Sequence, residues 1–100
     1  MNDHSCPCAS TQIAGLAALD GKHDFLDEMM IQFSRRRKLI VDGLNSIKGI
    51  KCNNPGGAFY VFPNISGTGM SGNEFADKCL NEAGVAIIPG VSFGKSARDF

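Results

Sequence analysis

The stretch that decides the fold is residues 71–90, SGNEFADKCLNEAGVAIIPG. It opens with Ser71 and has Glu74 three positions later, the S-x-x-E capping box that marks the start of a helix. The predicted helix ends at Gly84 and carries one apolar face, formed by Phe75, Ala76, Cys79, Leu80 and Ala83. The apolar run at 85–88 then predicts a strand, and the Pro-Gly pair at 89–90 a turn. A helix followed directly by a strand indicates a mixed α/β domain.

Two further strands are predicted upstream of this stretch. Residues 50–53 read as a short strand, and the Asn-Pro-Gly-Gly sequence at 54–57 reads as a turn. Residues 58–62 are aromatic and β-branched, which favours a second strand that Pro63 would end.

Two helices are predicted before the strands. Ser10 or Thr11 can cap a first helix that runs to about Leu19, with Gly21 as its stop. A second helix begins at Asp24 and ends at Lys48-Gly49, a length of about 23 residues, well above the usual helix length. Such a helix would suit a spine packed against something larger. Its apolar stripe has helical period and consists of Leu26, Met29, Met30, Phe33, Ile40, Val41, Leu44 and Ile47.

The sequence therefore predicts an α+β fold with the order α-α-β-β-α-β. We expect a short sheet packed on helices, one of them long, with at least one strand missing. The chain has 100 residues, which fits one domain at most. Residues 1–100 are taken as a single partial domain, with 1–9 as an extended loop.

Composition excludes several classes of function. The chain is 43% hydrophobic and 20% charged, and its ten basic residues balance ten acidic ones. A net charge of zero argues against nucleic acid or an anionic membrane as the main partner. No apolar run approaches the ~20 residues of a membrane span, and Met1-Asn2-Asp3-His4 lacks the features of a secretory signal. We expect a cytoplasmic protein with reduced thiols.

Short motifs give little support for catalysis. Residues 67–72 fit G-x-G-x-x-G, but four residues separate them from the preceding strand, and the next strand carries no acid for a ribose. A Gly-rich flexible loop explains them better. Residues 92–95 fit S-x-x-K but lack the partner motifs of acyl-transfer serines. The basic run Arg35-Arg36-Arg37-Lys38 spans a full helical turn, so it is typical of a solvated face.

The cysteines leave one alternative open. Cys52 and Cys79 fall in a predicted strand and on an apolar helix face, so both are expected to be small core residues. Cys6 and Cys8, with His4, would offer metal ligands, but the second ligand pair of a zinc site is absent. A metal or redox module built on these three residues remains a competing interpretation.

Four stretches together resemble class I/II aminotransferases. Residues 54–63, NPGGAFYVFP, resemble the P-x-G-A-F-Y-x-F strand of that family, and residues 82–94, EAGVAIIPGVSFG, resemble its E-x-G-V-A-x-x-P-G-x-x-F-G stretch. The run from Arg35 to Leu44 is similar to the R-R-R of the family's long connecting helix, and residues 5–19 are similar to the preceding loop and helix. The order and spacing agree over essentially the whole chain. The sequence of residues 62–67, FPNISG, looks most like that of bacterial-type aspartate aminotransferases.

The resemblance implies the truncated C-terminal small domain of a fold-type I enzyme. Members of this family use pyridoxal 5′-phosphate (PLP), held covalently by a lysine, to move an amino group between an amino acid and a 2-oxo acid. Aspartate is the first expectation for the amino donor. The implied partners are the large domain of the same polypeptide and a second subunit in a homodimer.

The segment omits the residues that the family uses for chemistry. The PLP lysine and the Asp that pairs with the pyridine nitrogen lie upstream in the family, and the Arg that binds the substrate carboxylate lies just past Phe100. Arg98 falls two residues too early for that role, and only the loop at Ser5 would approach a neighbouring subunit's phosphate. We therefore assign no catalytic, cofactor-binding or metal-binding residue and expect no bound PLP and no activity from this chain alone. None of its lysines has the family's context: Lys22, Lys38, Lys48, Lys51, Lys78 and Lys95.

A second competing interpretation is a non-catalytic interaction module that uses the same small-domain fold. The flanking coding sequence would discriminate the two. A lysine loop upstream and a strand with an Arg downstream would indicate the enzyme, whereas a stop codon directly after Phe100 would indicate the module.

Overall fold

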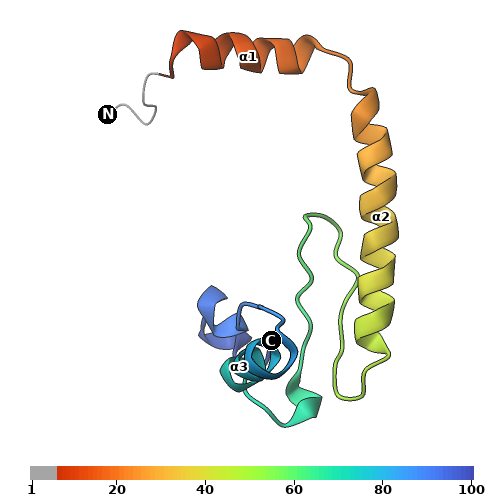
Figure 1. The fold of residues 1–100 in the computed structure, drawn as a ribbon, viewed down its shortest axis with the longest axis vertical. Coiled ribbons are helices and arrows are strands. Elements are labelled where there is room, and N and C mark those ends of the chain that lie inside the picture. Colours follow the sequence, from red (N-terminus) through yellow and green to blue (C-terminus); the bar gives the residue numbers. More distant parts are fainter. Residues whose placement is uncertain (1–6) are drawn as a thin grey trace. The chain divides into compact units, whose positions relative to one another are not determined.

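The computed structural model describes residues 7–100 and divides the chain into two compact units, Met1–Ile31 and Gln32–Phe100 (Figure 1). Each unit is described by itself. The helical elements, in chain order, are α1 (Ala9–Asp20), α2 (Asp24–Asn45), the 3₁₀ turn η1 (Ser66–Thr68), α3 (Gly72–Ala83), and the 3₁₀ turns η2 (Gly90–Phe93) and η3 (Lys95–Ala97).

Helix α1 begins earlier than the sequence predicts. Its N-cap is Cys8, and Ser10 and Thr11 lie inside the first turn. Gln12 helps to fix this start, because its Nε2 donates to the carbonyl oxygen of Pro7 at 2.9 Å. The helix ends at Asp20 with Gly21 as its C-cap, as expected. No residue of α1 is buried.

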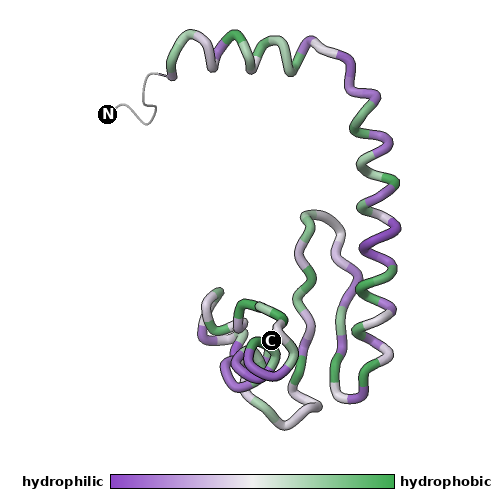
Figure 2. Tube along the Cα trace, in the orientation of Figure 1, coloured by the Kyte–Doolittle hydropathy of each residue, from purple (hydrophilic) through white to green (hydrophobic). Residues whose placement is uncertain are grey.

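Helix α2 begins at Asp24 as expected, with Asp24 and Asp27 placing negative charge in its first turn. It ends at Asn45, before the predicted end. The reason is a tightened last turn, in which the Ser46 amide donates to the carbonyl oxygens of both Asp42 and Gly43. Hydrophobic and hydrophilic residues alternate along the helix (Figure 2). Of its predicted apolar stripe, only Val41 is buried.

The predicted short sheet is wrong, and with it the α+β class. Among residues 7–100 the only strand-like pairing is one isolated antiparallel bridge between Lys51 and Asn64. The two residues exchange backbone hydrogen bonds of 2.9 and 2.7 Å. Beyond the bridge, residues 52–63 form a long hairpin-like loop without a ladder (Figure 1). The described chain is helical with irregular connections.

The ladder fails for reasons that can be named. The side chain of Asn45 binds both backbone polar groups of Cys52. Its Nδ2 donates to the Cys52 carbonyl oxygen, and its Oδ1 accepts from the Cys52 amide, both at 2.9 Å. Ala58 adopts a φ of +58°, the left-handed region that no strand residue uses. Pro55 and Pro63 have no amide to donate. The strand propensity of 58–62 is therefore overridden.

The third predicted strand is also absent. Gly84 takes a φ of +67° and closes α3, and the Val85 amide donates to the Cys79 carbonyl oxygen at 2.9 Å. Residues 85–89 then run on without a paired neighbour. The side chains of Val85 and Ile88 stay 51% and 65% exposed. An apolar run becomes a strand only where another strand offers its backbone, and none does so among the described residues.

The second unit is held together by its last residues. The carbonyl oxygens of Arg98, Asp99 and Phe100 accept hydrogen bonds from the amides of Gly72, Ile65 and Gly90, at 3.1, 2.8 and 2.8 Å. The segments that contain these three amides are thereby all bound to residues 98–100. The ring of Phe100 also stacks on that of Phe62, with centroids 4.8 Å apart. The small core of this unit consists of Val41, Ile50, Cys52, Ile65 and Ala76.

Candidate functional site

The described residues form one groove with the character of a binding site. It lies within the second unit, between α2 and the loop of residues 55–61, and we call it the α2–loop groove. Its volume is about 490 Å³, within the range of ligand sites. Helix α2 contributes Phe33, Arg36, Arg37, Leu39 and Ile40, and the loop contributes Pro55, Ala58, Phe59, Tyr60 and Val61.

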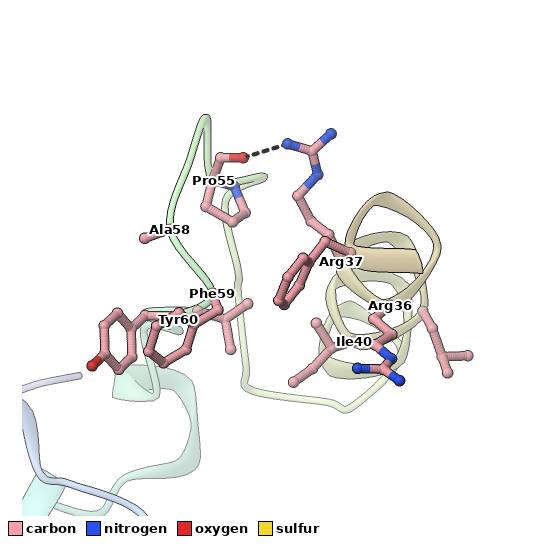
Figure 3. Close-up of a pocket in the computed structure, with 10 residues that line it drawn as sticks. Arg36, Arg37, Ile40, Pro55, Ala58, Phe59 and Tyr60 are labelled. Atoms are coloured by element: carbon pink, nitrogen blue, oxygen red, sulfur yellow. Dashed lines mark hydrogen bonds between the residues drawn. The ribbon is translucent and has the colours of Figure 1, made fainter. Parts of the chain in front are cut away.

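Arg37 ties the two walls of the groove together. Its Nη1 donates to the Pro55 carbonyl oxygen at 3.1 Å, so the guanidinium bridges from the helix to the turn (Figure 3). On the loop side the rings of Phe59 and Tyr60 lie against each other, with centroids 4.3 Å apart (Figure 3). The left-handed φ of Ala58 turns the chain just before this aromatic pair. The groove therefore owes its shape to the same features that prevent a sheet.

The charge of the groove is positive. Arg36 and Arg37 line it, whereas the ten lining residues include no carboxylate. The nearby Lys38 points its charge elsewhere, because its Nζ binds the Asp42 carboxylate at 2.8 Å. An apolar surface with guanidinium groups suits a ligand that combines an apolar part with a carboxylate. The lining includes no cysteine, histidine, carboxylate or lysine.

The G-x-G-x-x-G stretch has a structural explanation for each glycine. A Cβ on Gly67 would lie 2.7 Å from the Cα of Gly49, and a Cβ on Gly72 would lie 2.7 Å from the Phe100 carbonyl oxygen. Gly69 has a φ of +75° and caps η1. The amides of Thr68, Gly69 and Gly72 already donate within the chain. A phosphate cradle needs free amides here, so the hydrogen-bonded turn does not suit a nucleotide site.

The S-x-x-K residues lie on successive 3₁₀ turns. Ser92 is in η2 and Lys95 in η3, both exposed, and Gly94 separates them with a φ of +142°. No hydrogen bond between their side chains is found in residues 7–100. The motif therefore has no activated nucleophile in the described part of the chain.

The cysteines separate into buried and exposed thiols. Cys52 is buried as predicted, Cys79 is half-buried, and Cys8 is exposed. The Cys8 Sγ lies 3.2 Å from Ser10 Oγ and 2.9 Å from Thr11 Oγ1, and these hydroxyls lower the pKa of the Cys8 thiol from 9.0 to about 7. Within residues 7–100 no three metal-ligating side chains converge. His4 and Cys6 of the metal hypothesis, and the Ser5 loop, lie outside the described residues.

The lysines of this chain do not fit PLP. A lysine that binds the cofactor must reach a closed site and lose its proton readily. All six lysines are exposed, and none lines the α2–loop groove. Hydrogen bonding to Asp42 raises the pKa of Lys38, which holds its proton more tightly. Arg98 is likewise exposed, with its Nε 3.9 Å from the Asp99 carboxylate, and does not line the α2–loop groove.

Comparison with known proteins defines the class. The family model described as aminotransferase class I and II matches residues 1–99. The aspartate aminotransferase of Pyrococcus horikoshii is 45% identical over 91 residues, which cover 89% of this chain and 23% of the relative. The chain belongs to the class I and II aminotransferase family.

Two solved structures share the fold. The crystal structure of the aspartate aminotransferase from Rhizobium meliloti gives a TM-score of 0.82 at 40% identity, and covers 92% of this chain and 26% of its own. An aromatic aminotransferase from Pyrococcus horikoshii gives 0.87 at 38% identity, with coverages of 94% and 26%. The chain thus spans about a quarter of the length of the proteins that it matches.

No helix in residues 7–100 has both the length and the apolar character required to cross a membrane.

Proposed function

We propose that this chain is the C-terminal part of a PLP-dependent aminotransferase that moves an amino group from an amino acid to a 2-oxo acid. The observation that carries the proposal is the match along residues 1–99 to a family whose members are about four times longer. The six exposed lysines do not suit PLP, which supports a division of roles within the enzyme. In this proposal the lysine that binds PLP belongs to the remaining three quarters of the polypeptide. The isolated chain is inactive in this proposal and binds no PLP.

Aspartate is the proposed amino donor. Relatives named as aspartate aminotransferases are 45% and 41% identical to this chain. A relative named aromatic-amino-acid aminotransferase 2 is 35% identical, so an aromatic donor is the alternative to be measured beside aspartate. The segments that would contact the donor's side chain lie outside the α2–loop groove and outside this chain.

The proposed working form is a homodimer in the cytoplasm. The extent of exposed apolar side chains on α1 and α2 supports burial against the rest of the polypeptide and a second subunit. The three thiols at Cys8, Cys52 and Cys79 are free, which is ordinary for a reducing compartment.

The test is amino transfer by the full-length polypeptide encoded around residues 1–100. Purified protein is mixed with a 2-oxo acid and either aspartate or phenylalanine, and the new amino acid is measured by chromatography. We expect turnover with aspartate that exceeds turnover with phenylalanine. Chain 1–100 serves as the matched control and should give none. A full-length protein without transfer to any 2-oxo acid would contradict the proposal and favour an interaction module.

A further inference from the structure

The sequence contains two Asp-Gly pairs, Asp20-Gly21 and Asp42-Gly43. Such a pair can react within the chain itself. The glycine amide nitrogen attacks the carboxyl carbon of the aspartate side chain, a water molecule leaves, and a five-membered succinimide ring forms. Water then opens the ring at either carbonyl group, and one product is isoaspartate, in which the backbone runs through the former side chain. Glycine favours the ring closure because it has no Cβ to hinder the attacking nitrogen.

Asp20-Gly21 lies at a helix end whose last hydrogen bond is not closed. Asp20 is the last residue of α1, and Gly21 is its C-cap. At the ends of α2 and α3, the amides of Ser46 and Gly84 donate to the carbonyl oxygen four residues earlier, both at 3.1 Å. The Gly21 amide makes no such bond among the backbone hydrogen bonds of residues 7–100. Its nitrogen is therefore free to attack the neighbouring carboxyl group.

The charge of Asp20 loosens the same helical turn. A carboxylate at the C-terminus of a helix lies at the negative end of the helix dipole, and the last turn of α1 contains no basic residue to offset it. Asp20 is exposed and takes part in none of the ion pairs found in residues 7–100. Fraying of a helix end costs little free energy. The Asp20 backbone can therefore reach the conformation in which its carboxyl carbon meets the Gly21 nitrogen.

Asp42-Gly43 has the same chemical groups in a protected position. Gly43 lies inside α2, where each amide donates to the carbonyl oxygen four residues earlier. The Asp42 carboxylate is bound by the Nζ of Lys38 at 2.8 Å. Ring closure at this pair requires local opening of α2 and release of the carboxylate from Lys38. The chain thus contains its own control for Asp20-Gly21.

We propose that Asp20-Gly21 is a site of spontaneous isoaspartate formation in the native protein, and that α2 protects Asp42-Gly43 from the same reaction. The inference goes beyond the proposed function, since the reaction needs no cofactor, substrate or second subunit. The water released on ring closure balances the water consumed when the ring opens. The product inserts a methylene group into the backbone where α1 leads into α2 (Figure 1). The matching enzyme class is a methyltransferase that esterifies isoaspartyl carboxylates with a methyl group from S-adenosylmethionine.

The test is the accumulation of isoaspartate in the full-length protein. Native protein is kept at physiological pH and temperature, and timed samples are digested with trypsin, which separates the two pairs by cutting after Lys22 and Lys38. Isoaspartate is measured by enzymatic methyl transfer from labelled S-adenosylmethionine and located by electron-transfer fragmentation. We expect it to form at Asp20 at least about tenfold faster than at Asp42, the ratio that about 1.4 kcal/mol of local opening in α2 produces.

The same protein unfolded in guanidinium chloride separates the effect of structure from that of sequence. Both Asp-Gly pairs are then equally accessible, so their rates of isoaspartate formation should be similar. A native ratio no larger than the ratio in the unfolded protein would overturn the proposal. Native protein that forms no isoaspartate at Asp20 would overturn it as well.

Asp20→Glu identifies the reacting residue. Glutamate keeps the negative charge but would have to close a six-membered ring, so methyl transfer to this peptide should fall to background. Asp42→Glu is the matched control and should leave the signal at Asp20 unchanged. Methyl transfer that persists at the same level in Asp20→Glu would show that another residue is its source and would contradict the assignment.

Discussion

Two glycines of the second unit are required by close approach of the backbone. A Cβ on Gly90 would meet the carbonyl oxygen of Ala97 and lie 2.8 Å from that of Phe100. A Cβ on Gly72 would meet the same Phe100 oxygen at 2.7 Å. Both glycines donate their amides to the segment that blocks a side chain. Backbone atoms cannot rotate away as a side-chain tip can, so these positions tolerate only glycine.

Gly90→Ala tests this requirement. We expect a loss of about 1–3 kcal/mol, the usual cost of overpacking, because the backbone of residues 97–100 must shift. Gly43→Ala is the control: Gly43 lies inside α2 with nothing within 4 Å of its Cβ position, and Ala there should stabilise the helix by about 0.5–1 kcal/mol. Thermal melts of the full-length protein measure both. A neutral Gly90→Ala would show that the approach is looser than described.

The Cys8 thiol should be reactive near neutral pH. The hydroxyls of Ser10 and Thr11 stabilise the thiolate and lower the thiol pKa from 9.0 to about 7, so the rate of alkylation by iodoacetamide should rise with pH to half its maximum near pH 7. A Cys6→Ser background leaves Cys8 as the only thiol of its peptide, and buried Cys52 is the slow internal control.

Removing both hydroxyls checks the cause of the shift. In a variant with Ser10→Ala and Thr11→Val the thiolate loses its donors, so the midpoint should rise toward the ordinary value of 9.0. An unchanged midpoint would mean that another group sets the Cys8 pKa.

At the scale of elements, the Asn45 side chain holds the segment that follows α2. Asn45 leaves the end of the helix and bonds both backbone groups of Cys52, as a neighbouring strand would do. The amide side chain can serve as donor and acceptor at once. Because Cys52 is buried, its backbone groups depend on this partner.

Asn45→Ala should therefore destabilise the loop and expose the Cys52 amide. An unpaired buried backbone group costs about 1–3 kcal/mol, so hydrogen exchange at Cys52 should accelerate by at least about fivefold. Asn45→Asp retains the acceptor for the amide but loses the donor to the carbonyl oxygen, and should protect the amide better than Ala does. Exchange at Cys52 that is equally slow in all three proteins would show that the clamp is not what protects it.

Local signals predicted the helices well and the strands badly. The capping of α3 follows the sequence closely, because Ser71 accepts from the Glu74 amide and Gly84 ends the helix in the left-handed region. These features depend on neighbours in sequence. A sheet depends on partners far along the chain, and neither the Asn45 clamp nor the left-handed Ala58 has a pattern that sequence reasoning could detect.

The groove was missed for a related reason. The Arg35–Lys38 run read as a solvated face, and residues 58–62 read as a strand, so Arg36 and the aromatic pair were placed in different contexts. One signal was present: Phe59 and Tyr60 are adjacent, and successive residues of a strand face opposite sides. Two neighbouring aromatic residues near the basic run of a helix indicate a contact surface better than a single core face.

At the scale of the whole molecule, many large apolar side chains of α1 and α2 are exposed. Ile13, Leu16 and Leu19 of α1 are all more than half exposed, and so are Phe25 and Ile31 of α2. Contiguous exposed apolar surface drives association. That the long helix packs against something larger stays a prediction.

Chain 1–100 alone should therefore self-associate or have a low melting temperature. We expect its melting to depend on protein concentration and to fall below that of the full-length protein, because no large domain covers its apolar side chains. Analytical ultracentrifugation and calorimetry over a range of concentrations measure this. A monomer with a sharp melt above about 65 °C, beyond the usual mesophilic range, would count against the account.

The central claim is that this chain lacks the cofactor lysine of its family and depends on the rest of the polypeptide for it. Borohydride reduction of the full-length protein in the presence of PLP, followed by peptide mapping, tests it most directly. We predict one dominant labelled lysine outside residues 1–100, with only scattered traces on the exposed lysines within it. A single dominant label on Lys22, Lys38, Lys48, Lys51, Lys78 or Lys95 would contradict the account.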